Sequence, residues 1–166
     1  DPAEDFYVLA DGTVRFTLGV GRRDTSAGEI IRRGEVFGWA ALVETTQRRI
    51  ATAYCLTPCE VLALNGDGSM LMNLGVLVSI TNSAPRNLIL FVFENEIYEV
   101  TGGQPIPGGG HANLAAMAKR AGFPHTFEFT ELSAFDKELP NILKLDGPVF
   151  VTVQAGPSGK PLSTKA

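Results

Sequence analysis

The first 65 residues carry the short alternating pattern of a β protein. Residues 6–9 form an apolar run that ends at Asp11-Gly12, and every second position from Val14 to Val20 is apolar. A strand, a two-residue turn and a second strand predict a β-hairpin. After a glycine-bounded turn at 34–38, a single helical turn is expected over 39–42, and β character returns at 49–54. The region is predicted to be antiparallel β.

From Cys59 onward the pattern changes to strands that alternate with helices. The chain predicts a strand at 61–64, a helix at about 69–82 capped by Ser69, and a fully apolar strand at 88–93. A helix near 112–121, a strand near 126–130, a helix capped by Ser133 and a strand at 149–153 follow. This order predicts a doubly wound, parallel α/β sheet, with residues 155–166 as a flexible tail. The chain as a whole is therefore expected to be mixed α/β (α+β overall), a partial antiparallel β-roll joined to a partial parallel α/β unit.

Composition narrows the functional classes. The chain has 166 residues, 14 basic and 18 acidic, and a net charge of −4. Because Lys and Arg residues do not cluster into a basic surface, nucleic-acid binding is not expected. The longest apolar run, 88–93, is far shorter than the roughly 20 residues that cross a bilayer, so no membrane span is expected. Cys55 and Cys59 form one C-x3-C pair, without the second ligand pair of a zinc site. We expect both to be buried thiols of a cytoplasmic protein.

Candidate chemistry lies where two predicted strands end. Gly66-Asp67-Gly68-Ser69 follows the strand at 61–64, and Glu94-Asn95-Glu96 follows the strand at 88–93. Ligands of parallel sheets bind at this edge, where the amides of Gly68 and Ser69 could meet a phosphate. Oxygens from Asp67 and Asn95 suit Mg²⁺, and the surrounding carboxylates would repel a diphosphate that lacked a cation. An ordinary Asx-type turn at Asp67 is the alternative.

These residues resemble the diphosphate-binding domain of thiamine-diphosphate enzymes, of the phosphonopyruvate and sulfopyruvate decarboxylase type. The likeness covers roughly residues 61–154 and includes Thr101-Gly102-Gly103-Gln104. It implies that Asp67, Asn95 and the Ile97 carbonyl bind Mg²⁺, while Gly66, Gly68 and Ser69 contact the cofactor. Glu94 departs from the Asn or Asp that is usual there. The family also needs a pyrimidine-binding domain whose glutamate activates the cofactor, which implies a separate subunit here.

The first half resembles the later strands of a cyclic-nucleotide-binding β-roll. The resemblance rests on residues 6–14, 34–38, 49–52 and 59–62. It implies that Arg49 would hold the cyclic phosphate, but Trp39 stands in place of the ribose-binding glutamate, which argues against nucleotide binding. Residues 1–64 are thus expected to be a partial β-roll and 59–154 a partial cofactor-binding unit, with the strand 59–64 shared.

Three functional hypotheses follow. The first is a fragment that binds Mg²⁺ and thiamine diphosphate, resembles a 2-oxoacid decarboxylase and is not active alone, so that no catalytic residue is assigned. The second is a natural or engineered chimera that binds no ligand. The third is a cyclic-nucleotide sensor, which Trp39 disfavours. Unpaired strand edges of two partial sheets also predict a homodimer or strand exchange.

Overall fold

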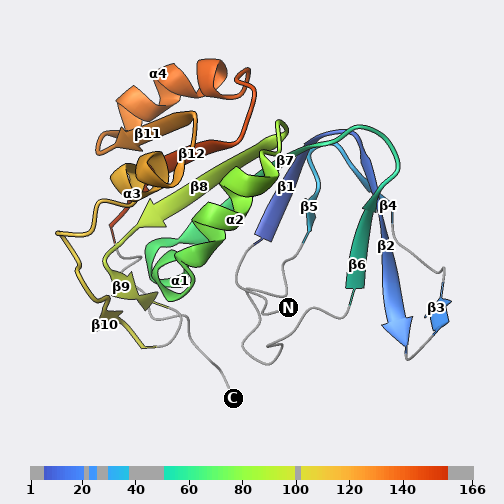
Figure 1. The fold of residues 1–166 in the computed structure, drawn as a ribbon, viewed down its shortest axis with the longest axis horizontal. Coiled ribbons are helices and arrows are strands. Elements are labelled where there is room, and N and C mark those ends of the chain that lie inside the picture. The colour runs from blue at the N-terminus through green and yellow to red at the C-terminus, as the bar shows by residue number, and fades with distance from the viewer. Residues whose placement is uncertain (1–5, 21–22, 26–29, 38–50, 100–101, 157–166) are drawn as a thin grey trace. The chain divides into compact units, whose positions relative to one another are not determined.

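The structure is a computed structural model that describes residues 6–20, 23–25, 30–37, 51–99 and 102–156 (Figure 1). The chain divides into two compact units. Unit 1 comprises residues 1–64 and 87–89, and unit 2 comprises residues 65–86 and 90–166. Trp39 and Arg49 lie outside the described residues, as does the tail from residue 157 onward. No helix in the described ranges is long and apolar enough to cross a membrane.

Unit 1 is built from antiparallel strands. They are β1 (Phe6–Asp11), β2 (Thr13–Val20), β3 (Arg23–Thr25), β4 (Ile30–Arg32), β5 (Val36–Phe37), β6 (Ala51–Cys55) and most of β7 (Glu60–Gly66). β2 pairs with β3, β4 and β6, whereas β1 pairs with β5 and β7. The prediction of antiparallel β structure is therefore confirmed for the described strands.

The predicted hairpin is wrong in its pairing. Both strands exist, but among the described pairings β1 and β2 take their partners from different sheets. Gly12, which joins them, has φ +97°, and a Cβ there would lie 2.7 Å from the Cys59 sulfur. A glycine at this corner lets the chain leave one sheet and enter the next while Cys59 packs against it. The buried side chains of this core are those of Leu9, Val14, Ile31 and Cys59.

The cysteine prediction holds for only one of the two residues. Cys59 is buried and Cys55 is exposed, and both are free thiols. Cys55 is the last residue of β6, and residues 53–58 around it are all exposed. The side chain of Cys55 therefore reaches solvent where the strand runs into a surface turn.

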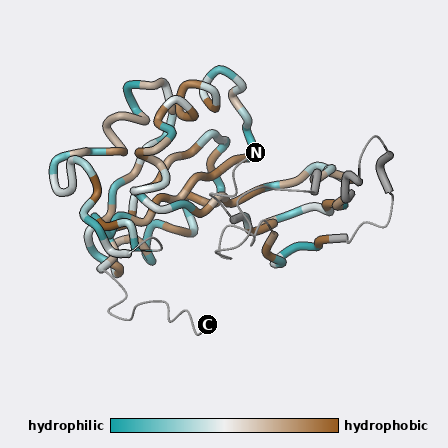
Figure 2. The backbone as a smooth tube through the Cα atoms, turned by 90° about the horizontal axis from the view of Figure 1, so that it is seen from below, coloured by the Kyte–Doolittle hydropathy of each residue, from teal (hydrophilic) through white to brown (hydrophobic). Residues whose placement is uncertain are grey.

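Unit 2 alternates strands and helices. Its helices are α1 (Asp67–Met72), α2 (Gly75–Ser83), α3 (Leu114–Ala121) and α4 (Leu132–Ile142). The strands β8 (Leu88–Glu94), β12 (Val149–Gln154) and β11 (His125–Phe129) lie in that order, with β11 parallel to β12, and β9 (Ile97–Tyr98) pairs with β10 (Gln104–Pro105). The first two residues of β8 belong to unit 1. β8 and β12 are both largely buried. Hydrophobic residues run along the strands in the interior (Figure 2).

Helices cover both faces of the β11–β12 pair, as a doubly wound sheet requires. The ring of Phe129 packs on Phe135 of α4, with centroids 5.6 Å apart. On β12, Phe150 packs on Phe123, which follows α3, with centroids 5.5 Å apart. Phe150 pairs with Thr126. Because side chains alternate between the faces of a strand, Thr126 and Phe129 face opposite sides, and so do α3 and α4.

Two predicted helix caps are wrong. The first helix begins at Asp67 after an extended Gly66, so Ser69 lies inside its first turn and not at its cap. That helix ends at Met72 and a second begins at Gly75. Ser133 likewise lies inside α4, whose cap position is Glu131. The predicted end of α3 is confirmed: Gly122 has φ +111° and its N–H bonds to the carbonyl of Ala118.

Candidate functional site

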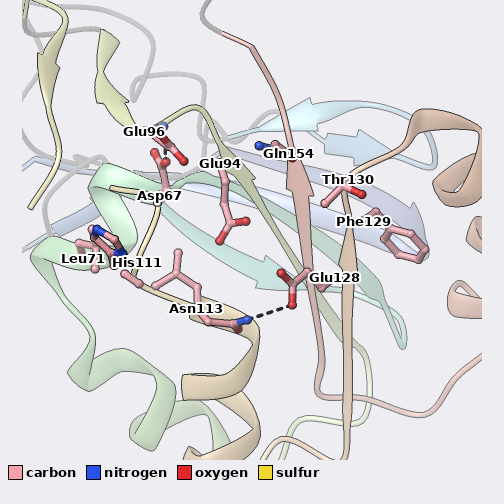
Figure 3. Close-up of a pocket in the computed structure, with 13 residues that line it drawn as sticks. Asp67, Leu71, Glu94, Glu96, His111, Asn113, Glu128, Phe129, Thr130 and Gln154 are labelled. Atoms are coloured by element: carbon pink, nitrogen blue, oxygen red, sulfur yellow. Dashed lines mark hydrogen bonds between the residues drawn. The ribbon is translucent and has the colours of Figure 1, made fainter. Parts of the chain in front are cut away.

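A pocket of about 300 Å³ opens at the carboxyl ends of the unit 2 strands (Figure 3). Its walls come from the start of α1, the end of β8, the segment before α3, and the ends of β11 and β12. The lining residues are Asp67, Leu71, Glu94, Glu96, Gly110, His111, Ala112, Asn113, Leu114, Glu128, Phe129, Thr130 and Gln154. This is the edge at which the sequence places the candidate site.

Asp67 joins the two sequence motifs. Its side chain is only 3% exposed. Oδ1 accepts a hydrogen bond from the Gly68 N–H at 2.7 Å, and Oδ2 accepts one from the Glu96 N–H, also at 2.7 Å. The second bond brings the turn after β7 into direct contact with the turn after β8, 29 residues further along the chain. Each carboxylate oxygen still has a lone pair for another partner.

Asn95 and Ile97 flank the residue that Asp67 holds. The Asn95 Oδ1 accepts a hydrogen bond from the Ile97 N–H at 3.2 Å, and its Nδ2 donates to Glu99 Oε2 at 2.9 Å. Neither residue lines the pocket, but both belong to the turn fixed by Asp67 and Glu96. The predicted oxygen donors of Asp67, Asn95 and Ile97 thus come from two segments that the fold brings together.

Gly66, Gly68 and Ser69 form the other part of the predicted site. Gly66 is the extended residue before α1, and Gly68 is buried in its first turn. The hydroxyl of Ser69 is buried and has no hydrogen-bond partner in the structure. A buried polar atom without a partner costs free energy, which a ligand at this turn could recover.

Gly68 leaves no room for a side chain. A Cβ at this position would lie 2.7 Å from Tyr98 Cδ1 and 3.3 Å from Ile106 Cγ2. We expect Gly68→Ala to lower the free energy of unfolding by about 1–3 kcal/mol, because the methyl group would overpack against the tyrosine ring. Urea denaturation measures the loss.

Gly75→Ala is the matched control. A Cβ at Gly75 would meet only Asn73 Oδ1, at 3.9 Å, so we expect little change or a small gain in stability. The loss at Gly68 should shrink when Tyr98 is also changed to Leu. An equal loss in both backgrounds would contradict contact with Tyr98 as its cause.

The pocket is strongly acidic. Asp67, Glu94, Glu96 and Glu128 all line it. Burial, followed by the charges of Glu128, Asp67 and Glu96, raises the pKa of Glu94 to about 7. In the described ranges, no group of three or more His, Cys, Asp or Glu side chains is arranged to hold a metal ion. The predicted ligand set is of another kind: one carboxylate, one amide oxygen and one backbone carbonyl.

Sequence reasoning missed the far wall of the pocket. Glu128 lines it from β11, and its Oε2 accepts a hydrogen bond from Asn113 Nδ2 at 3.0 Å. Asn113 also caps α3 by accepting from the Ala116 N–H at 2.7 Å. An Asn before the apolar positions of α3 was a detectable cap signal. The alternation Phe127-Glu128-Phe129 likewise placed Glu128 on the face opposite the two rings.

Two family models match the chain. Residues 46–153 match the family model described as "Thiamine pyrophosphate enzyme, C-terminal TPP binding domain". The chain belongs to this family. Residues 1–69 match the model of the cyclic nucleotide-binding domain. Both resemblances drawn from the sequence are confirmed, and the two matched ranges overlap over residues 46–69.

Curated relatives agree with the first match. The chain is 41% identical over 87 residues to the sulfopyruvate decarboxylase subunit beta of Methanocaldococcus jannaschii, which covers 51% of this chain and 46% of that protein. It is 38% identical over 98 residues to the subunit beta of Methanothermobacter thermautotrophicus, covering 59% and 50%. It is 34% identical over 115 residues to phosphonopyruvate decarboxylase of Streptomyces viridochromogenes, covering 66% and 29%. The chain therefore spans half or less of the length of these relatives.

Proposed function

We propose that the chain holds the diphosphate of thiamine diphosphate (thiamine pyrophosphate) through a divalent cation at the edge of unit 2. In this proposal Asp67, Asn95 and the Ile97 carbonyl bind Mg²⁺. The phosphate oxygens contact the turn formed by Gly66, Gly68 and Ser69. The contact that supports the proposal is the 2.7 Å hydrogen bond from the Glu96 N–H to Asp67 Oδ2, because it joins Asp67 to the turn that carries Asn95 and Ile97.

The residues present fit such a group. Carboxylate, amide and carbonyl oxygens are the hard ligands that Mg²⁺ prefers, and Mg²⁺ commonly bridges a protein to substrate phosphates. The unpartnered Ser69 hydroxyl supplies a donor for a phosphate oxygen.

The acidic pocket supports the cation in this proposal. Four carboxylates line it, and like charges about 4 Å apart repel by about 1 kcal/mol even in water. A diphosphate alone would meet the same repulsion. A divalent cation between Asp67 and the phosphates converts this field into an attractive one.

We further propose that decarboxylation of a 2-oxoacid requires a second polypeptide. When bound, thiamine diphosphate supplies the electron sink for loss of carbon dioxide, and the protein supplies binding and orientation. The family resemblance implies a pyrimidine-binding domain that carries an activating glutamate. Two relatives are named as beta subunits, which supports a partner subunit here as well. This chain alone is then expected to bind the cofactor without turnover.

Calorimetry tests the binding proposal directly. Titration of thiamine diphosphate into the chain should release or absorb heat with Mg²⁺ present and give none with a chelator, because the cation bridges the diphosphate to Asp67. Cyclic AMP titrated under the same conditions serves as the second ligand. Cofactor binding that persists in the chelator would contradict the cation site. Heat from cyclic AMP alone would favour a nucleotide sensor, and no heat from either ligand would favour a chimera without a ligand.

A further inference from the structure

Asn95 is held from both ends of its amide group. Nδ2 donates a hydrogen bond to Glu99 Oε2 at 2.9 Å, and Oδ1 accepts one from the Ile97 N–H at 3.2 Å. Asn95, Ile97 and Glu99 are all partly buried. The hydrogen bond from the Glu96 N–H to Asp67 Oδ2 holds the segment that carries these three residues.

These two contacts specify which end of the amide faces which way. An ionised carboxylate can only accept hydrogen bonds, and a backbone N–H can only donate one. Glu99 therefore selects the NH₂ end of Asn95, and the Ile97 N–H selects the oxygen end. If the amide rotated by 180°, an oxygen would face the Glu99 carboxylate and an NH₂ group would face the Ile97 N–H. Both contacts would become repulsive.

We infer that Glu99 is a positioning residue that turns the Asn95 oxygen toward the cation site. This inference rests on the proposed function, since it assumes that Asn95 Oδ1 binds the cation. Glu99 contacts the ligand set through the Asn95 amide, so it acts on the cation indirectly. Residues that orient metal ligands in this way typically change metal affinity 10- to 100-fold when they are replaced.

Glu99→Gln is the variant that isolates this role. A glutamine can donate or accept a hydrogen bond, so it no longer selects one end of the Asn95 amide, and only the Ile97 N–H still favours the native orientation. We expect the affinity for Mg²⁺, titrated calorimetrically at saturating thiamine diphosphate, to fall by about 10- to 100-fold. The thermal midpoint of the metal-free protein should stay close to that of the wild type. Asp136→Asn, which removes an exposed charge on α4, is the control and should leave the affinity unchanged.

A second background separates orientation from simple charge attraction. In Asn95→Asp both ends of the side chain are oxygens, so no orienting partner is needed. Adding Glu99→Gln to Asn95→Asp should leave Mg²⁺ affinity nearly unchanged, because this background has no amide orientation to lose. If Glu99 acted only by attracting the cation through space, its loss would weaken binding equally in both backgrounds.

The possible outcomes test the role of Glu99 separately from the proposed cation-dependent binding of thiamine diphosphate. A wild-type chain that binds no Mg²⁺ with the cofactor overturns both. A wild-type chain that binds, together with a Glu99→Gln variant that binds equally well, overturns only the role of Glu99. An equal loss in the wild-type and Asn95→Asp backgrounds also overturns it. A loss confined to the background that keeps Asn95 supports it.

Discussion

Asp67→Ala is expected to abolish cation-dependent binding of thiamine diphosphate and to destabilise the chain as well. The carboxylate accepts hydrogen bonds from two backbone N–H groups, those of Gly68 and Glu96, and it is almost fully buried. Alanine would leave both donors without their acceptor, at about 1–3 kcal/mol for each unsatisfied buried group. We therefore expect a loss of about 2–6 kcal/mol in the free energy of unfolding, measured by urea denaturation.

Asp67→Asn separates the structural loss from the functional one. Asparagine keeps the size of the side chain and one oxygen acceptor, so one of the two amide contacts survives. Its NH₂ end is no ligand for Mg²⁺, and its amide oxygen lacks the negative charge with which the Asp67 carboxylate attracts the cation. We expect a smaller loss of stability than for alanine but an equally complete loss of cofactor binding in calorimetry. If the asparagine variant bound thiamine diphosphate with wild-type affinity in Mg²⁺, Asp67 would not be a cation ligand.

The α/β half of the fold was predictable because its strands are buried on both faces. The runs at 88–93 and 149–153 are apolar at nearly every position. Because side chains alternate between the two faces of a strand, such a run indicates a strand that is covered on both faces. The β half was predictable as strands but not as pairings. Asp11-Gly12 specifies a sharp turn, and nothing local specifies that the strands on either side of it will pair with β7 and β6 rather than with each other.

The candidate site was predictable to the extent that it follows strand ends. The Asp67 and Asn95 motifs are separated by one helical crossover, and in a parallel sheet this spacing brings them to the same edge. The hydrogen bond from the Glu96 N–H to Asp67 could not be inferred from spacing, because it depends on how the turn after β8 folds back. The wall made by Asn113 and Glu128 was missed because it comes from distant segments with no motif of their own.

Glu94→Gln is expected to stabilise the cation-free chain above neutral pH and to have no effect at pH 4. The pKa of Glu94 is raised to about 7, above the ordinary 4.5 of the unfolded chain, by burial and then by Glu128, Asp67 and Glu96. Below pH 4.5 the carboxyl is protonated in both states and its burial favours neither. Between pH 4.5 and 7 the unfolded chain releases a proton that the folded chain keeps, so stability falls as pH rises.

Above pH 7 the Glu94 carboxylate is ionised in the folded chain too, and its burial lowers the free energy of unfolding by the full amount. Glutamine is neutral, so the Glu94→Gln variant does not lose this stability. Because the pocket is open to solvent, screening reduces the expected gain to about 1–2 kcal/mol, which is a rise of roughly 2–8 °C in the thermal midpoint at about pH 8. Scanning calorimetry in a chelator at pH 4 and pH 8 measures both values, with Asp136→Asn on the exposed face of α4 as the control. A gain of equal size at both pH values would mean that packing, not the charge of Glu94, is responsible. Since a bound cation favours the ionised carboxylate, we expect Mg²⁺ with thiamine diphosphate to reduce the advantage of glutamine at the higher pH.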